Sequence, residues 1–118
     1  MNIENGLAKL KKSPFRSRFH LDEADREYIQ KTGMEKLRLH AVDFVAVKLA
    51  PAEPENDGRQ TPMHGHPVFK AMHGCAMCCR NCLNKWWHVA PHRALTAIQQ
   101  EKIVNFLMAW VEKQLKKS

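Results

Sequence analysis

Side chains that bind transition metals gather in one short stretch of this sequence. Between Met63 and His88 the chain carries all four of its cysteines and four of its seven histidines. Thiolate sulfur and neutral imidazole nitrogen are the donors that zinc and related metals prefer in proteins. The stretch therefore predicts a metal site, with zinc as the first candidate for the cofactor.

The spacing within this stretch suggests which residues bind the metal. Cys75, Cys78, Cys79 and Cys82 are spaced i, i+3, i+4, i+7, which puts them on one face of a continuous helix. Cys79 and Cys82 also have the two-residue gap common in zinc sites. Tetrahedral zinc needs four ligands, and the expected set is His66, His73, Cys79 and Cys82, with Cys78 as the first substitute. His64, His88 and Cys75 are reserves, and His40 would join them if its ring turned inward.

Two other kinds of protein would use the same residues. Buried free cysteines also act as small hydrophobic side chains, so one alternative is a metal-free interaction protein with buried or redox-active cysteines. The other is a small zinc-dependent enzyme. No acid lies between Asp57 and Glu101, so the acid or base of such an enzyme would be Glu35 or Asp43. A structural metal is favoured over a catalytic one, and enzymatic activity is left open.

Signatures of other metal chemistries are absent. Neither the H-E-x-x-H motif nor the deaminase signature occurs in the sequence. Four cysteines in a row along one straight helix would not converge around an iron–sulfur cluster. The sequence therefore favours a single bound ion over a cluster.

The elements that must position these residues are expected to be helices, about four in number, in a small and mainly α bundle. Asp22 and Gly33 are typical of the start and end of a helix, and a second helix should run from Met34 to Leu49 before Pro51. The cysteine-rich segment predicts a third helix from His73 to about Trp87.

The last predicted helix begins at Thr96, which forms a capping-box pattern with Gln99, and runs to about Leu115. Its apolar stripe should be buried and consists of Ile103, Phe106, Leu107, Trp110 and Val111. Between the second and third helices lies a long loop rich in proline, from Pro51 to Pro62, which the metal is expected to staple to the cysteine helix. Residues 1–19 are predicted to be a basic N-terminal arm, and residues 20–118 a single helical domain.

The charge of the chain suggests a partner. The net charge is +7, and much of the excess lies at the two ends: the first twenty residues hold five basic side chains against Glu4. Such ends can bind nucleic-acid phosphates, and Arg80, Lys85 and Trp86 add basic and aromatic groups near the cysteines. Nucleic acid is therefore a candidate partner, although solvated basic tails explain the same charge.

No apolar run exceeds six residues, which excludes a predicted membrane span. The N-terminal region has no apolar block typical of a secretory signal. The expected location is the cytoplasm, where thiols stay reduced.

Several motifs resemble those of a small bacterial protein family described only as a domain of unknown function. They are F-R-S-R-F-H-L, the A-P-A-E-P-x-N-D-G-x-Q-T-P loop, G-H-P-V-F followed by His73, and C-C-R-N-C-L-N-K-W, and the resemblance runs from about Phe15 to Trp110. Carried over, it implies roles for Gly65-His66-Pro67, His73, Cys78-Cys79-Arg80, Cys82 and Lys85-Trp86, but not for Cys75. The family pattern has His directly after the Trp, whereas here Trp87 precedes His88. The resemblance implies a cytoplasmic bacterial protein and no particular activity.

Overall fold

A computed structural model describes residues 2–117 as a mainly helical protein. These residues form six α-helices: α1 (Ile3–Lys11), α2 (Glu23–Thr32), α3 (Met34–Phe44), α4 (Pro67–Gly74), α5 (Arg80–Trp87) and α6 (Ala97–Leu115). A short 3₁₀ turn, η1 (Arg16–Arg18), follows α1, and a π-turn, η2 (Val45–Leu49), extends α3. No strand occurs among the described residues. The predicted mainly α class is confirmed, but the helix count is six, not about four, for two separate reasons.

The first reason is that the segment predicted as a basic arm contains helix α1. The side chain of Asn2 accepts a hydrogen bond from the backbone N–H of Asn5 and so caps the start of the helix. Leu7 and Leu10 are buried on its inner face. Gly6 lets α1 approach α6 closely, because a Cβ atom there would lie 2.6 Å from the ring of Phe106. The basic residues of α1 therefore belong to a packed helix.

The second reason is a break in the cysteine-rich segment, where one helix was expected from His73 to Trp87. Helix α4 ends at Gly74, and Ala76 adopts the left-handed conformation with φ of 57°. Helix α5 begins only at Arg80, after Cys79 as its N-cap. Gly74 packs against the indole of Trp110, which a Cβ atom would approach to 3.0 Å. The prediction that four cysteines share one helical face is therefore wrong.

The other predicted helix boundaries are confirmed. Asp22 and Asp25 form a reciprocal capping box at the start of α2, and Gly33 ends that helix with φ of 87°. Thr96 and Gln99 form a second capping box at the start of α6. Both helices thus begin where short side-chain acceptors satisfy backbone N–H groups that have no partner within the helix.

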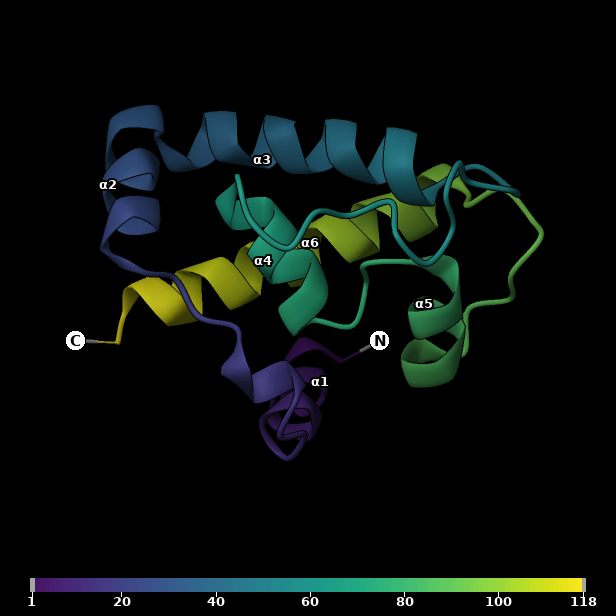
Figure 1. Cartoon of the computed structure of the whole chain (residues 1–118), viewed down its shortest axis with the longest axis horizontal. Helices are drawn as coiled ribbons and strands as arrows, with labels where there is room; N and C mark the ends of the chain where they lie inside the picture. Colours follow the sequence, from purple (N-terminus) through teal and green to yellow (C-terminus); the bar gives the residue numbers. More distant parts are fainter. Residues whose placement is uncertain (1, 118) are drawn as a thin grey trace.

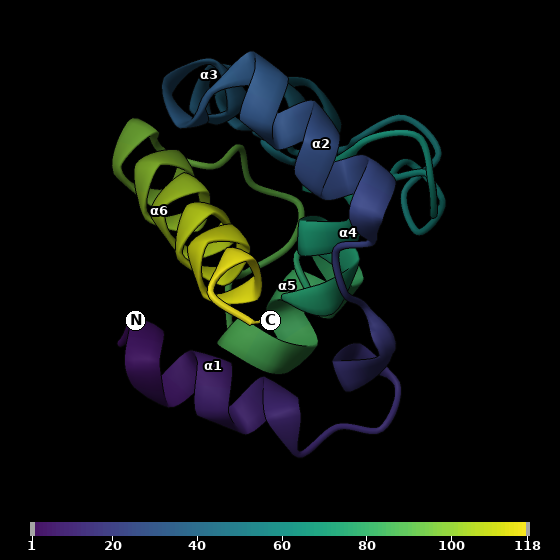
Figure 2. The same ribbon diagram turned by 90° about the vertical axis from the view of Figure 1, so that its left-hand side faces the viewer.

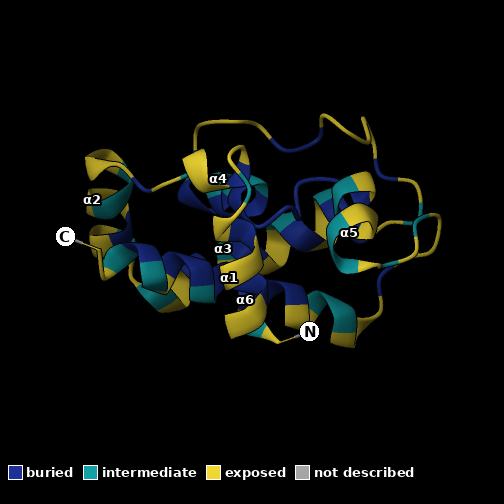
Figure 3. Cartoon of the chain, turned by 90° about the horizontal axis from the view of Figure 1, so that it is seen from below, coloured by how far each residue is buried: buried dark blue, intermediate teal, exposed yellow. Residues whose placement is uncertain are grey.

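Helix α6 is the centre of the packing. It contacts α1, α3, α4 and η2, and it lies between α3 and α1 in the side view (Figure 2). All five residues of its predicted apolar stripe are buried. The buried faces of the helices meet around this element (Figure 3). The core therefore forms around α6, and α5 with the cysteine turn sits at one end of the molecule (Figure 1).

The proline-rich loop runs along the surface but is anchored at its end. The Gln60 side chain donates to the carbonyl of Lys48 and to the carboxylate of Asp57. Thr61 is buried, and its hydroxyl donates to the carbonyl of Cys78 at 2.7 Å. The loop is thus attached to the cysteine turn by side-chain hydrogen bonds. No helix of residues 2–117 has the length and apolar character needed to cross a membrane.

Candidate metal centre

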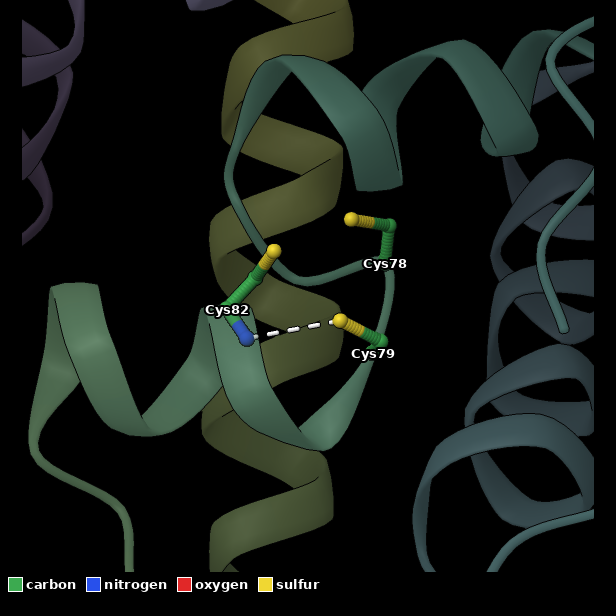
Figure 4. A group of neighbouring side chains, drawn as sticks. All are labelled: Cys78, Cys79 and Cys82. Atoms are coloured by element: carbon green, nitrogen blue, oxygen red, sulfur yellow. Dashed lines mark hydrogen bonds between the residues drawn. The ribbon is translucent and has the colours of Figure 1, made fainter. Parts of the chain in front are cut away.

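Three of the four cysteines converge on one point (Figure 4). Cys78 and Cys79 lie in the turn between α4 and α5, and Cys82 lies in the first turn of α5. Their Sγ atoms are all within 4.8 Å of one another. A tetrahedral zinc ion with Zn–S bonds of about 2.3 Å holds its sulfurs about 3.8 Å apart, so only a small closing movement is needed. These three cysteines, here called the cysteine cluster, have the donor set of a metal site.

The break between α4 and α5 is what creates the cluster. As N-cap, the Cys79 Sγ accepts a hydrogen bond from the backbone N–H of Cys82 at 3.4 Å. This contact folds the Cys79–Cys82 pair into one tight turn. Convergence also removes the objection to an iron–sulfur cluster that rested on a straight helix. Sulfurs this close nonetheless suit one ion better than several irons, which would spread their ligands more widely.

A buried arginine from the N-terminal segment lies against the cluster. Arg16 is 8% exposed, and its Nη2 lies 3.2 Å from the Sγ of Cys82. Its Nη1 donates to the carbonyl of His73 at 2.8 Å and lies 3.8 Å from the Sγ of Cys78. A guanidinium in this position stabilises negative charge on the sulfurs. Sequence reasoning missed this residue, since no spacing connects position 16 to position 78.

The protonation of the cluster is uneven. Hydrogen bonds from the thiols of Cys78 and Cys79, together with Arg16, hold the pKa of Cys82 well below its usual value. The pKa of Cys78 is raised, because it donates to the neighbouring sulfurs and is buried. The cluster therefore carries its negative charge on Cys82, and a metal ion would displace the protons of the other two.

Cys75 lies outside the cluster. It is completely buried among core residues, and burial raises its pKa well above the ordinary value. It behaves as a small hydrophobic side chain. The family resemblance, which gave no role to Cys75, agrees with this position.

His66 is placed away from the cluster, in a group of aromatic side chains. It is the N-cap of α4, where its Nδ1 accepts a hydrogen bond from the backbone N–H of Val68 at 3.0 Å. Its Nε2 lies 3.1 Å from the Nδ1 of His40, and Tyr28 and Phe44 pack against the ring. Because Nδ1 accepts, the proton of the neutral ring belongs on Nε2, which donates to His40. Burial, with a smaller effect of His40, lowers the pKa of His66 to about 4.

The other candidate histidines also lie outside the cluster. His73 uses its Nε2 to contact the carbonyl of Thr61 at 2.9 Å, and its ring stacks on Phe19. Its backbone carbonyl nevertheless shares the Arg16 guanidinium with the cluster. His64 and His88 are exposed. Of the five residues predicted as ligands, the structure thus brings Cys78, Cys79 and Cys82 together and holds His66 and His73 by other contacts.

Arg80 is not available to bind a phosphate, contrary to its predicted role at a nucleic-acid surface. It is 1% exposed, and its guanidinium donates to four carbonyls, those of Leu49, Pro51, Ala90 and Arg93. It joins the end of η2 to the loop that follows α5. Lys85 is exposed and Trp86 is half-buried, with the ammonium of Lys9 5.2 Å from the Trp86 ring centre.

Among the described residues no carboxylate joins the three sulfurs as a possible ligand. Asp57 lies near the cluster, but its Oδ1 accepts a hydrogen bond from the backbone N–H of Arg80 at 3.2 Å. Glu35 and Asp43, the two acids considered for an enzyme, are exposed on α3. The arrangement thus offers three sulfurs and a guanidinium, and the chemistry that it supports is metal or thiol chemistry.

Comparison with known protein families gives a match over most of the chain. The model of a family described as "Domain of unknown function (DUF4186)" matches residues 4–112. The match includes Arg16 and the whole cysteine cluster. No solved structure matches the chain.

Proposed function

The chain belongs to this family of unknown function, and we propose that it is a zinc-binding module in which Cys78, Cys79 and Cys82 hold the ion in a structural role. The observation that carries the proposal is the convergence of three sulfurs within 4.8 Å on a turn between two helices. Zinc fits best, because thiolate ligands in a compact single-ion arrangement are typical of structural zinc.

The electrostatics of the site support a metal. Zinc with three thiolates has a net charge of −1, which is costly to bury without a partner. The Arg16 guanidinium, at 3.2 Å from Cys82 and 3.8 Å from Cys78, would neutralise this charge. The site and its counter-ion together are then close to neutral.

A fourth ligand is needed to complete a tetrahedron. Of the predicted histidines, His73 is the better candidate, because its backbone already shares Arg16 with the cluster. Its ring would have to leave the carbonyl of Thr61 to reach the ion. Water is the other candidate. His66 would have to give up its contact with Val68 or with His40, since both of its nitrogens are engaged.

The structural role follows from what the cluster joins. A bound ion would tie the start of α5 to the end of α4, and Arg16 would tie this unit to the segment after α1. The hydroxyl of Thr61 donates to the carbonyl of Cys78, so the proline-rich loop is also attached to this unit. Reduced thiols suit the bacterial cytoplasm, which we propose as the location.

Metal analysis of protein purified without added metal tests this proposal. We expect about one zinc per chain in the wild type and less than about 0.2 in C79S or C82S. The matched control is C75A, which removes a buried cysteine outside the cluster and should keep its zinc. H73N and H66N locate the fourth ligand: a large drop in affinity for H73N alone would assign it to His73. A metal-free wild type with four titratable thiols would overturn the proposal.

A second candidate function is a redox or nucleophilic thiol protein. It is favoured by the contact between Arg16 and Cys82, since a thiolate beside a cation at a helix start is a nucleophile. Metal-free protein should then react with iodoacetamide at Cys82 faster than at Cys75, with a rate nearly constant above pH 6. Equal slow reaction of all four thiols would exclude it.

Association with nucleic acid is a weaker proposal, because the buried Arg80 can no longer be counted among the residues that would contact phosphate. It rests on the basic ends and on Lys85 and Trp86, which remain accessible. Affinity for a short oligonucleotide should fall steeply with salt. Salt-independent binding, or none at low salt, would contradict it.

A further inference from the structure

The two basic ends of the chain meet in space. The end of α1, the η1 turn and the end of α6 surround one small cavity of about 70 Å³. Four of its lining residues are cationic: Lys11, Arg16, Lys113 and Lys117. In the side view the C-terminal end of α6 lies beside α1 (Figure 2). Charge that is split between the two termini in the sequence is therefore concentrated at one place in the fold.

The charge around this cavity is not balanced by acids. None of its described lining residues is Asp or Glu. The carboxylate ion pairs among residues 2–117 involve Lys31, Lys70 and His92, and none of the three lysines at the cavity. Arg16 already faces the sulfur of Cys82, so the excess positive charge comes from the three lysines. Cations held together repel one another, and a bound anion would relieve this repulsion.

One of the four cations is fixed before any ligand arrives. Arg16 is more than nine-tenths buried, and the carbonyl of His73 with the sulfurs of Cys78 and Cys82 hold its guanidinium. The flexible lysines supply charge, and Ser17 and Gln114 add polar groups to the lining. Because this arginine is already immobilised, the site loses less side-chain conformational entropy on binding than a site of lysines alone would.

The end of α6 near the cavity does not cancel this positive charge. A helix C-terminus carries a partial negative charge, which would disfavour an anion. In α6 this end is capped by Arg26, whose guanidinium donates to the carbonyls of Gln114 at 2.7 Å and Leu115 at 3.4 Å. Arg26 therefore offsets the negative end of α6.

The size of the cavity limits the ligand. A volume of about 70 Å³ corresponds to roughly two or three waters, too small for a nucleoside. We propose that this cavity binds one tetrahedral oxyanion of the phosphate class, either free phosphate or a phosphate group on the outside of a nucleic acid.

Titration with inorganic phosphate tests the proposal, because Trp110 lines the cavity and reports on it. At low ionic strength, phosphate should give a saturable change in amide and indole NMR signals of Ser17 and Trp110, whereas chloride at equal ionic strength should not. K113Q/K117Q should weaken the binding at least tenfold. The matched control K102Q, an exposed lysine on the same helix, should leave it unchanged.

A single-stranded oligonucleotide distinguishes the two sources of phosphate. If it binds more tightly than free phosphate and shifts the same signals, with a salt slope that K113Q/K117Q reduces, the phosphate belongs to a nucleic acid. If the oligonucleotide neither shifts these signals nor displaces phosphate, the ligand is free phosphate. An unsaturable response to both, or equal affinity in wild type and K113Q/K117Q, would overturn the site. Zinc content should be the same in all of these variants, so the outcome is independent of the metal proposal.

Discussion

Arg16 joins parts of the chain that are 66 residues apart in sequence. Its guanidinium is held by a carbonyl of α4 and lies against two sulfurs of the cysteine cluster, while its own element follows α1. A group that hydrogen-bonds to metal ligands sets their charge and orientation, so removing it typically costs 10- to 100-fold in metal affinity.

We therefore expect R16Q to weaken zinc affinity by about 10- to 100-fold, measured by competition with a chromogenic chelator. R16K keeps the charge but loses the forked geometry, and should give an intermediate loss. R18Q is the control, since Arg18 lies in the same turn and is exposed. Equal affinities of R16Q and R18Q would show that the guanidinium does not act on the metal site.

His66 links stability to pH. Its pKa is about 4 in the folded protein and near 6.5 in the unfolded chain, so the unfolded state takes up a proton first as the pH falls. The stabilisation is complete above about pH 6.5 and is lost between about pH 6.5 and 4. Because the ring is only half-buried, we expect a loss on the order of 1–2 kcal/mol.

Urea unfolding at pH 7.5 and pH 5 measures this effect. H66N should remove most of it, because asparagine still caps α4 but does not titrate. H88N is the control: His88 is exposed in a left-handed position, which asparagine tolerates. A pH dependence that persists in H66N would assign it to another group.

At the scale of elements, α1 depends on one close approach. A methyl group at Gly6 would lie 2.6 Å from the ring of Phe106, so either the ring or the helix must move. We expect G6A to destabilise the protein by about 1–3 kcal/mol, less a gain in helix propensity of up to about 1 kcal/mol. N5A, at the exposed neighbouring position, should change the free energy of unfolding by less than about 0.5 kcal/mol. A stabilised G6A would mean that α1 is not packed as described.

The elements that could be predicted were those with local signals. Asp22 and Gly33, and Thr96 with Gln99, mark helix ends through hydrogen bonds to neighbouring backbone groups, and these boundaries are confirmed. The break after Gly74 could not be predicted in this way. The cysteines have the i, i+3, i+4, i+7 spacing of one helical face, so the sequence pattern predicts a continuous helix. The break depends instead on the packing of Gly74 against Trp110 and on Cys79 as the N-cap of α5.

In the candidate site, too, only the residues with local sequence signals could be predicted. Cys78, Cys79 and Cys82 are close in sequence, so their types and spacing were enough to propose them. The position of their counter-ion, Arg16, depends on contacts between distant segments. So does the burial of Arg80, whose guanidinium donates to four carbonyls. Residue type alone made Arg80 a candidate for binding phosphate, and only the fold shows that its guanidinium is already used.

At the scale of the whole molecule, most of the hydrophobic core consists of residues outside the cysteine cluster. The buried residues of α3, α4 and α6 form most of this core, Cys78 and Cys79 are buried in it, and Cys82 packs against it. Small zinc fingers unfold without zinc because they lack such a core. Here the metal would add to a fold that is already stable.

Removing zinc should therefore lower the stability without unfolding the protein. With free zinc at about 1,000 times its Kd, binding contributes about 4 kcal/mol, which corresponds to a fall in Tm on the order of 10 °C after chelation. Far-UV circular dichroism at 25 °C should keep most of its helical signal. The near-UV bands of Trp86 should change, because its ring centre lies 6.0 Å from the Arg16 guanidinium that contacts the cluster. C79S without a chelator should reproduce the lower Tm, and C75A should still respond to chelation. Complete loss of helical signal on chelation would mean that the metal, and not the core around α6, determines the fold.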